Sequence, residues 1–285
     1  MTTKYVTFYS YDERTTLAAA NVAWLAAKGK RVVLIDFDLT SPGLHLLEPF
    51  QKPFRDFQKD KSNMGGLFEM FLYMQDYKTT GSIADYYCLK PINIGGKGEL
   101  FLVPSGNMDY KYFAKAPYFN LQKFYEEGNG RELFLTLREE IAYQFCKPDL
   151  VIFNSTTGLT EASSACTILF PDQVIAFTNI NSHGLSGTKL IIDALEAETS
   201  GREGIKLPPI EIIVAASQVP GNHKALVDKQ IKHAEELLGR RIDLSLPYDQ
   251  VSTITDRLAV MDDDPCRKPI ADKYAELYEL IACNK

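Results

Sequence analysis

The chain has 285 residues, 45% hydrophobic and 24% charged, which is typical of a globular protein near the upper size of one hydrophobic core. Its formal net charge of −6 leaves no general basic surface for nucleic acid. No apolar run approaches the roughly 20 residues that span a bilayer, and the first residues lack the pattern of a signal peptide, so we expect a cytoplasmic protein without a membrane segment.

Short apolar runs alternate with stretches of helical spacing along the chain. Such nearly unbroken runs are typical of strands buried on both faces of a parallel sheet. They predict an α/β fold in which a doubly wound, mostly parallel sheet carries helices on both faces, within a single domain over residues 1–285. The predicted strands are Tyr5 to Tyr9, Arg31 to Asp36, Leu100 to Val103, Leu150 to Phe153, Gln173 to Thr178 and Ile210 to Ala215.

Helical spacing is clearest between the first two strands, where apolar residues from Leu17 to Ala27 fall on one stripe before Gly29. Strand, helix and strand together form a unit of the size of a βαβ crossover. Later helices are predicted at Arg131 to Phe145, Gly187 to Thr199, Leu226 to Leu238 and Pro269 to Ala282.

Aromatic residues are concentrated in residues 49–99 and again in residues 110–125. We interpret both segments as elaborations packed on the edge or in the crevice of the sheet, and the first of them as an insertion. Their aromatic side chains either enlarge the core or form a surface for a partner, because aromatic residues are enriched at interface hot spots.

The second predicted strand ends in Asp36-Phe-Asp38 and is followed by Pro42-Gly43. This pattern places two carboxylates at the carboxyl edge of the sheet, where open α/β folds bind their ligands. It resembles the second-strand motif of the ParA/MinD family of P-loop ATPases, in which these aspartates act around the magnesium ion and the attacking water. The segments 102–107, 149–158, 170–174 and 246–248 resemble further landmarks of that family, so the resemblance covers nearly the whole chain and implies a P-loop NTPase-like fold.

The loop after the first strand departs from the family pattern. In the subgroup that this chain resembles, the loop reads Lys-Gly-Gly-Val-Gly-Arg-Thr, and its glycines let backbone N–H groups converge on phosphate oxygens. Here residues 11–20 contain no glycine and no lysine, and the segment is about two residues short. Asp12 and Glu13 place carboxylates where polyphosphate would sit, and two unit charges 4 Å apart repel by roughly 4 kcal/mol at an effective dielectric constant of 20.

Other positions of the family site also differ. Asn154 stands where the resemblance implies a magnesium-linked aspartate, Thr156 replaces an arginine, and Ser217-Gln218 replaces an Asn-Arg or Ser-Arg pair near the base site. If a nucleotide binds, the resemblance assigns residual catalytic roles to Asp36 and Asp38 and magnesium contacts to Thr16 and Asp36. The candidate nucleotide contacts are then Arg14, Thr15, Thr16, Asn154 and Ser217.

Structural roles explain the same residues without a nucleotide. Thr15 or Thr16 would cap the following helix, and Asp36 and Asp38 would be hydrogen-bonded carboxylates at the end of a strand.

The leading hypothesis is therefore a ParA/MinD-like pseudo-ATPase that binds no cofactor and acts as a scaffold for another protein or, in a homodimer, for its own copy. The alternative is an active, nucleotide-dependent dimerising ATPase switch that binds ATP and Mg²⁺ through an atypical loop. Nucleic acid is not an expected partner. The one local basic cluster is interpreted as the solvated face of a helix and the turn after it: Lys229, Lys232, His233, Arg240 and Arg241.

Overall fold

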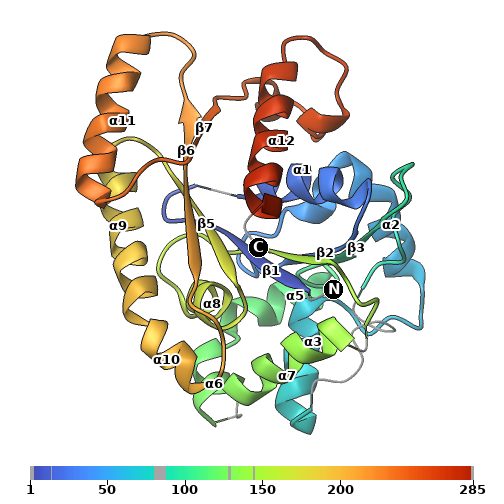
Figure 1. The fold of residues 1–285 in the computed structure, drawn as a ribbon. Coiled ribbons are helices and arrows are strands. Elements are labelled where there is room, and N and C mark those ends of the chain that lie inside the picture. The colour runs from blue at the N-terminus through green and yellow to red at the C-terminus, as the bar shows by residue number, and fades with distance from the viewer. Residues whose placement is uncertain (1–2, 14, 80–87, 128–129, 144, 284–285) are drawn as a thin grey trace.

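Parallel strands form the centre of the molecule. In the computed structural model, which describes residues 3–13, 15–79, 88–127, 130–143 and 145–283, a seven-stranded sheet has the order β3-β2-β4-β1-β5-β6-β7 (Figure 1). All of its strand pairs are parallel. The strands are β1 (Lys4–Ser10), β2 (Arg31–Asp36), β3 (Glu99–Val103), β4 (Leu150–Asn154), β5 (Gln173–Thr178), β6 (Glu211–Val219) and β7 (Leu244–Pro247).

Successive side chains of the central strands enter different cores, as the two-residue period of a strand requires. In β4, Leu150 and Ile152 belong to one hydrophobic cluster, whereas Val151 and Phe153 belong to a second cluster on the other face. Because both faces are covered, all five residues of β4 are buried. This explains why the predicted strands are almost unbroken apolar runs.

Helices cover both faces of the sheet (Figure 1). The first cluster packs β-strands against α1 and α12, and the second packs them against α3, α6 and α7. The helices in chain order are α1 (Thr16–Ala27), α2 (Glu48–Lys59), α3 (Leu67–Tyr77), α5 (Tyr110–Lys115), α6 (Leu121–Glu127), α7 (Gly130–Tyr143), α8 (Glu161–Ser164), α9 (Ser182–Ala197), α10 (Thr199–Gly204), α11 (Lys224–Leu238) and α12 (Lys268–Cys283). A π-helical turn, Ala165–Leu169, continues α8.

The predicted fold class is confirmed, and two predicted strands have the bounds that the structure gives, namely Arg31–Asp36 and Gln173–Thr178. The seventh strand was not predicted, because Leu244–Pro247 has only four residues and alternating burial. Helix α9 begins at Ser182, earlier than predicted, because the Asn181 side chain accepts a hydrogen bond from Gly184 N at 2.9 Å and caps the helix. None of the helices in the described ranges is both long and apolar enough to cross a membrane.

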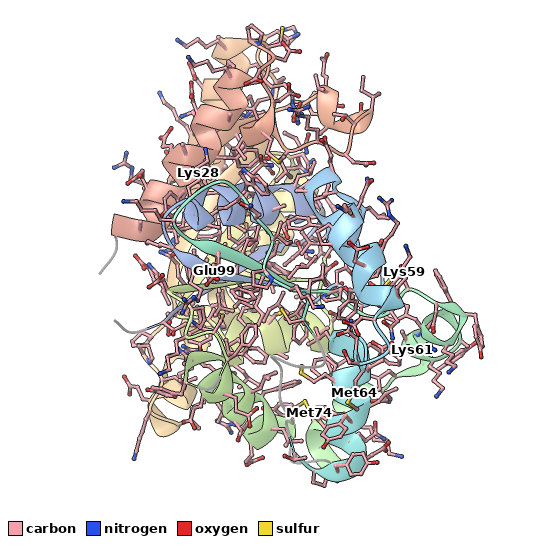
Figure 2. All side chains as sticks on the ribbon, turned by 90° about the vertical axis from the view of Figure 1, so that its right-hand side faces the viewer. Lys28, Lys59, Lys61, Met64, Met74 and Glu99 are labelled. Carbon is pink, nitrogen blue, oxygen red and sulfur yellow. The ribbon has the colours of Figure 1, made fainter. Side chains whose placement is uncertain are left out.

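The aromatic segment after β2 contributes to both cores. Phe50, Phe54 and Phe57 of α2 are buried in the first cluster, and Phe71 of α3 is buried in the second. Phe68 of α3 is also buried and packs edge-on against the ring of Tyr112. Figure 2 shows how α2 ends at Lys59 and how the chain continues past Met64 into α3. Enlargement of the core therefore explains these five rings. That residues 49–99 form an insertion in a single domain stays a prediction.

Candidate functional site

The carboxyl ends of β1, β2 and β4 bring the predicted site residues together. Strand β4 lies between the other two, and Asn154 at its end is in register with Phe8 of β1 and with Asp36 of β2. The loop after β1 then leads into α1, which begins at Thr16. This edge is where parallel α/β sheets hold their ligands, so it is the candidate functional site.

A chain of buried hydrogen bonds crosses the site. Thr15 Oγ1 donates to Asn154 Oδ1 at 2.9 Å, and Asn154 Nδ2 donates to Asp36 Oδ1, also at 2.9 Å. The other carboxylate oxygen, Asp36 Oδ2, accepts from the backbone N–H groups of Gly43 and Leu44, each at 3.2 Å. Asp36 is fully buried and Asn154 is 1% exposed, so these contacts form away from solvent.

Burial controls the protonation of Asp36. It raises the pKa of the Asp36 carboxyl to about 6, and the hydrogen bonds from Asn154, Leu44 and Gly43 offset part of that rise. The amide of Asn154 thus supplies the positive end of a dipole to Asp36 Oδ1, while the backbone N–H groups of Gly43 and Leu44 serve the other oxygen. An aspartate at position 154 would place a second negative charge there.

Asp38 holds the turn that follows β2. Its Oδ1 accepts hydrogen bonds from Thr40 N at 3.2 Å, Thr40 Oγ1 at 2.9 Å and Ser41 N at 2.9 Å. Thr40 Oγ1 also lies 3.5 Å from Thr156 Oγ1, so the turn after β2 contacts the turn after β4. Asp38 is 3% exposed and has the local structural role of a turn-forming aspartate.

Both acidic residues of the loop after β1 are bonded to neighbouring strand ends. Asn179, just after β5, donates to Asp12 Oδ2 at 3.0 Å, and Ser217 of β6 donates to Glu13 Oε1. Glu13 Oε2 is buried and has no hydrogen-bond partner among the residues that the structure describes. Burial accordingly raises the pKa of Glu13 to about 7, although the bond from Ser217 lowers it. Ser217, a candidate nucleotide contact, therefore faces an acidic side chain of its own chain.

Tyr11 anchors the same loop to helix α9. A Cβ added to Gly187 would lie 2.0 Å from the Tyr11 ring, so only the missing side chain of Gly187 lets the ring lie against the helix. The ring of His183, one turn earlier in α9, lies 5.3 Å from that of Tyr11, centroid to centroid. Asp12 makes a similar approach, since a Cβ on Gly184 would be 2.8 Å from its Oδ2.

The first turn of α1 is not capped as predicted. Thr15 occupies the N-cap position, but its hydroxyl donates to Phe8 O at 3.2 Å and to Asn154 instead of accepting from the helix. The predicted capping role of Thr15 is therefore wrong, because the buried partners outside the helix compete for the hydroxyl. Thr16 is the first helical residue, with its Oγ1 3.4 Å from Asn154 Nδ2. Arg14 lies outside the described residues.

This arrangement does not fit a magnesium nucleotide. Both oxygens of Asp36 already accept hydrogen bonds from within the chain, and Asp12 and Glu13 add negative charge beside the start of α1. In the described part of the chain, no three His, Cys, Asp or Glu side chains form a group that could hold a metal ion. A phosphate would meet carboxylates here, where the site would need converging N–H donors and a cation.

Several residues of the site were not singled out from the sequence. Asn179 is the partner of Asp12, and Gly184 and Gly187 admit the loop against α9. Asn179 follows directly after a predicted strand, which was the available signal, because the ends of neighbouring parallel strands meet at one edge. The two glycines carry no such signal, since they look like ordinary positions in a helix.

Comparison of the sequence with protein-family models and with curated proteins yields no match. Solved structures, in contrast, match over nearly the whole chain. McdA from Cyanothece in complex with ATP, a D38A variant by that protein's own numbering, is 16% identical with a TM-score of 0.68, and the match covers 99% of this chain and 97% of that one. MinD from Pyrococcus horikoshii OT3 with Mg-ADP is 17% identical with a TM-score of 0.62, covering 98% and 96%.

A third match is the MinC:MinD cell division complex of Aquifex aeolicus, which is 16% identical with a TM-score of 0.56 and covers 96% of this chain and 95% of that one. Identities this low establish similarity of fold. The chain has the P-loop NTPase-like fold of the MinD and McdA ATPases.

Proposed function

We propose that this protein is a ParA/MinD-like pseudo-ATPase that binds another protein or its own copy and has lost nucleotide binding. The observation that carries the proposal is the loop after β1, in which Asp12 and Glu13 are bonded to Asn179 and Ser217. These bonds hold the two carboxyl groups of the loop in the place where the phosphates of a nucleotide would lie. A triphosphate would have to break both bonds and then approach the Asp12 carboxylate and a Glu13 carboxyl that is partly ionised near pH 7. Two unit charges 4 Å apart repel by about 4 kcal/mol at a dielectric constant of 20.

The pairing of Asn154 with Asp36 supports the same proposal. In an active site of this fold, the resemblance implies an aspartate at position 154 that works through magnesium. Here an amide donates directly to Asp36 Oδ1 at 2.9 Å, so a hydrogen bond stabilises the carboxylate where the family pattern has a second acidic residue. Asp36 and Asp38 then act as structural residues that hold the turns after β2.

Exposed aromatic side chains supply a surface for a partner. Tyr110, Phe113 and Tyr118 are 77%, 71% and 85% exposed, whereas Tyr112 between them is buried. They lie on α5 and the short turn after it, which follow β3 at the ligand-binding edge of the sheet. Aromatic residues at the centre of interfaces contribute much of the binding free energy. The MinC:MinD complex gives one example of a protein of this fold bound to another protein.

Thermal denaturation with and without millimolar Mg-ATP tests the loss of nucleotide binding. We expect no change in the Tm of the wild-type protein, because a ligand raises Tm only if it binds the folded state, by an amount that grows with the logarithm of its concentration relative to Kd. A matched control variant replaces residues 11–14 by Lys-Gly-Gly-Val-Gly-Arg, which restores both the glycines and the length of the loop. The control is expected to show a raised Tm with nucleotide.

The alternative function, an active ATPase switch, predicts a different result. It requires the wild-type protein to gain several degrees in Tm with Mg-ATP and to release phosphate in a magnesium-dependent reaction that Asp36→Ala abolishes. Either result in the wild type would overturn the proposal. The partner surface is tested separately by comparing self-association and partner capture of the wild type with those of Phe113→Ser.

A further inference from the structure

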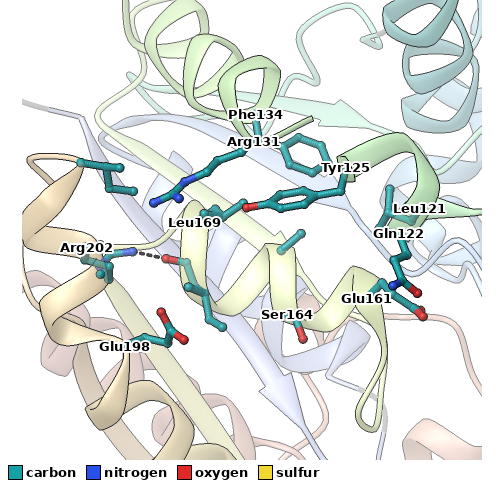
Figure 3. A pocket seen from close by; sticks show the side chains of 14 residues that line it. Leu121, Gln122, Tyr125, Arg131, Phe134, Glu161, Ser164, Leu169, Glu198 and Arg202 are labelled. Atoms are coloured by element: carbon teal, nitrogen blue, oxygen red, sulfur yellow. Dashed lines mark hydrogen bonds between the residues drawn. The ribbon is translucent and has the colours of Figure 1, made fainter. Parts of the chain in front are cut away.

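A cavity of about 350 Å³ lies on the face of the sheet that α6 and α7 cover, and no residue that lines it belongs to the candidate functional site. Its walls come from α6, α7, the helical segment 161–169 and α10 (Figure 3). The volume is within the range of small-molecule sites, which are mostly apolar with a few convergent polar groups. Leu121, Phe134 and Leu169 form apolar walls and are at most 8% exposed.

Two hydrogen-bond donors in this cavity lack acceptors. Arg131 Nε is buried and has no hydrogen-bond partner, and its guanidinium forms no ion pair with a described residue. The half-buried Tyr125 also contributes its hydroxyl, for which the described ranges contain no hydrogen-bond acceptor, and its ring centroid lies 6.3 Å from that of Phe134. Figure 3 shows the Arg131 guanidinium and the Tyr125 hydroxyl on the same side of the cavity, near Leu169. Buried donors normally find acceptors, so the buried Nε of Arg131 is free to donate to an anionic ligand in the cavity.

A second arginine adds positive charge at the inner wall. Arg202 is 1% exposed and donates to three backbone carbonyl oxygens, those of Pro208 at 2.8 Å, Pro171 at 2.7 Å and Ile168. Carbonyl oxygens satisfy its donors but carry no net charge. Within the described part of the chain Arg202 has no ion pair, so its field also favours an anion in the cavity. The bond to Ile168 fixes the π-helical turn, a type of turn that is frequent at functional sites.

The charges at the mouth limit the class of anion. Glu161 and Glu198 line the cavity and are exposed at its opening. They would repel a dianionic phosphate more strongly than a single carboxylate. A carboxylate also matches the planar guanidinium with two parallel hydrogen bonds. The remaining surface is apolar and suits a hydrocarbon or aromatic body.

We propose that this cavity binds a small amphipathic carboxylic acid, with its carboxylate held by Arg131 and Tyr125 and its apolar body against Leu121, Phe134 and Leu169. Arg202 does not contact the ligand through a free donor; it positions the π-helical wall and contributes charge. The site is separate from the loop after β1, so it does not depend on whether nucleotide binding is retained.

Calorimetric titration of the full chain with octanoate, below its micelle concentration, tests the proposal, with octanol, octylamine and acetate as comparison ligands. We expect octanoate to bind and the others to bind at least about tenfold more weakly, because a charged hydrogen bond contributes about 1.5 to 3 kcal/mol. Arg131→Gln is expected to weaken octanoate binding by about tenfold or more, and Tyr125→Phe by a smaller factor. Arg55→Gln, at an exposed position of α2, is the control for lost charge and should bind as the wild type does.

Three results would overturn the assignment: no octanoate binding by the wild type, equal binding of octanol or octylamine, or unchanged binding in a folded Arg131→Gln variant. Circular dichroism establishes folding of each variant before titration. Ala165→Leu places extra methyl groups in the cavity without touching the donors, so it should abolish binding while leaving the fold intact. If that variant is folded and still binds octanoate as tightly as the wild type, the ligand is not in this cavity.

Discussion

Replacing Asn154 by aspartate is the sharpest test of the buried hydrogen-bond chain. The change is nearly isosteric, but it turns the Nδ2–Oδ1 contact of 2.9 Å with Asp36 into a contact between two carboxylate oxygens. Two unit charges at that separation repel by about 6 kcal/mol at an effective dielectric constant of 20. Because both side chains are at most 1% exposed, water relieves little of this repulsion.

Protonation limits the cost of this substitution. If the pair takes up one proton, the neutral carboxyl donates to its neighbour and the hydrogen bond returns. Holding that proton costs about 1.36 kcal/mol for each pH unit above the ordinary pKa of a carboxyl. We therefore expect Asn154→Asp to lower the free energy of unfolding by about 4 to 6 kcal/mol at pH 8 and by only about 1 to 2 kcal/mol at pH 5.

Urea denaturation at the two pH values, without divalent cations, measures this difference. Asn120→Asp is the matched control, since Asn120 is exposed and its Oδ1 accepts a backbone N–H that an aspartate would accept equally well. The control should show little change at either pH. If Asn154→Asp costs less than about 1 kcal/mol at pH 8, or the same at both values, Asp36 and Asn154 do not form a buried pair.

Two further predictions concern the loop after β1. The pKa of Glu13 is raised to about 7 in the folded protein, so the folded state binds more protons than the unfolded state above about pH 4.5. The free energy of unfolding of the wild type should therefore fall as the pH rises through 7. Glu13→Gln should remove about 1 to 3 kcal/mol of that fall. Denaturation curves of the two proteins at pH 5 and pH 8 give the comparison, and parallel pH profiles would contradict it. Gly187→Ala should destabilise the protein by about 1 to 3 kcal/mol although alanine favours helices, because its Cβ would lie 2.0 Å from the Tyr11 ring. Tyr11→Ala in the same chain should recover most of that loss in a double-mutant cycle, and simple additivity would show that the ring does not lie there.

The sheet was predictable because its strands are buried on both faces. Arg31–Asp36 and Gln173–Thr178 are recognisable in the sequence as mostly apolar runs. The positions of the strand ends then indicated where the site residues meet. The partners of those residues were less predictable, since a hydrogen bond such as that from Asn179 to Asp12 joins residues far apart in the sequence. Thr15 shows the same limit. The local sequence pattern favoured a helix cap, but the Thr15 hydroxyl donates instead to Asn154 at the end of β4.

The contact between Tyr11 and Gly187 also has an evolutionary consequence. While an aromatic ring lies in the adjacent loop, glycine is the only residue that fits at position 187. A chain that kept small residues in that loop would be free to carry alanine or serine in the second turn of α9. Substitutions at the two positions should therefore covary among relatives, with glycine at position 187 wherever an aromatic residue stands at position 11.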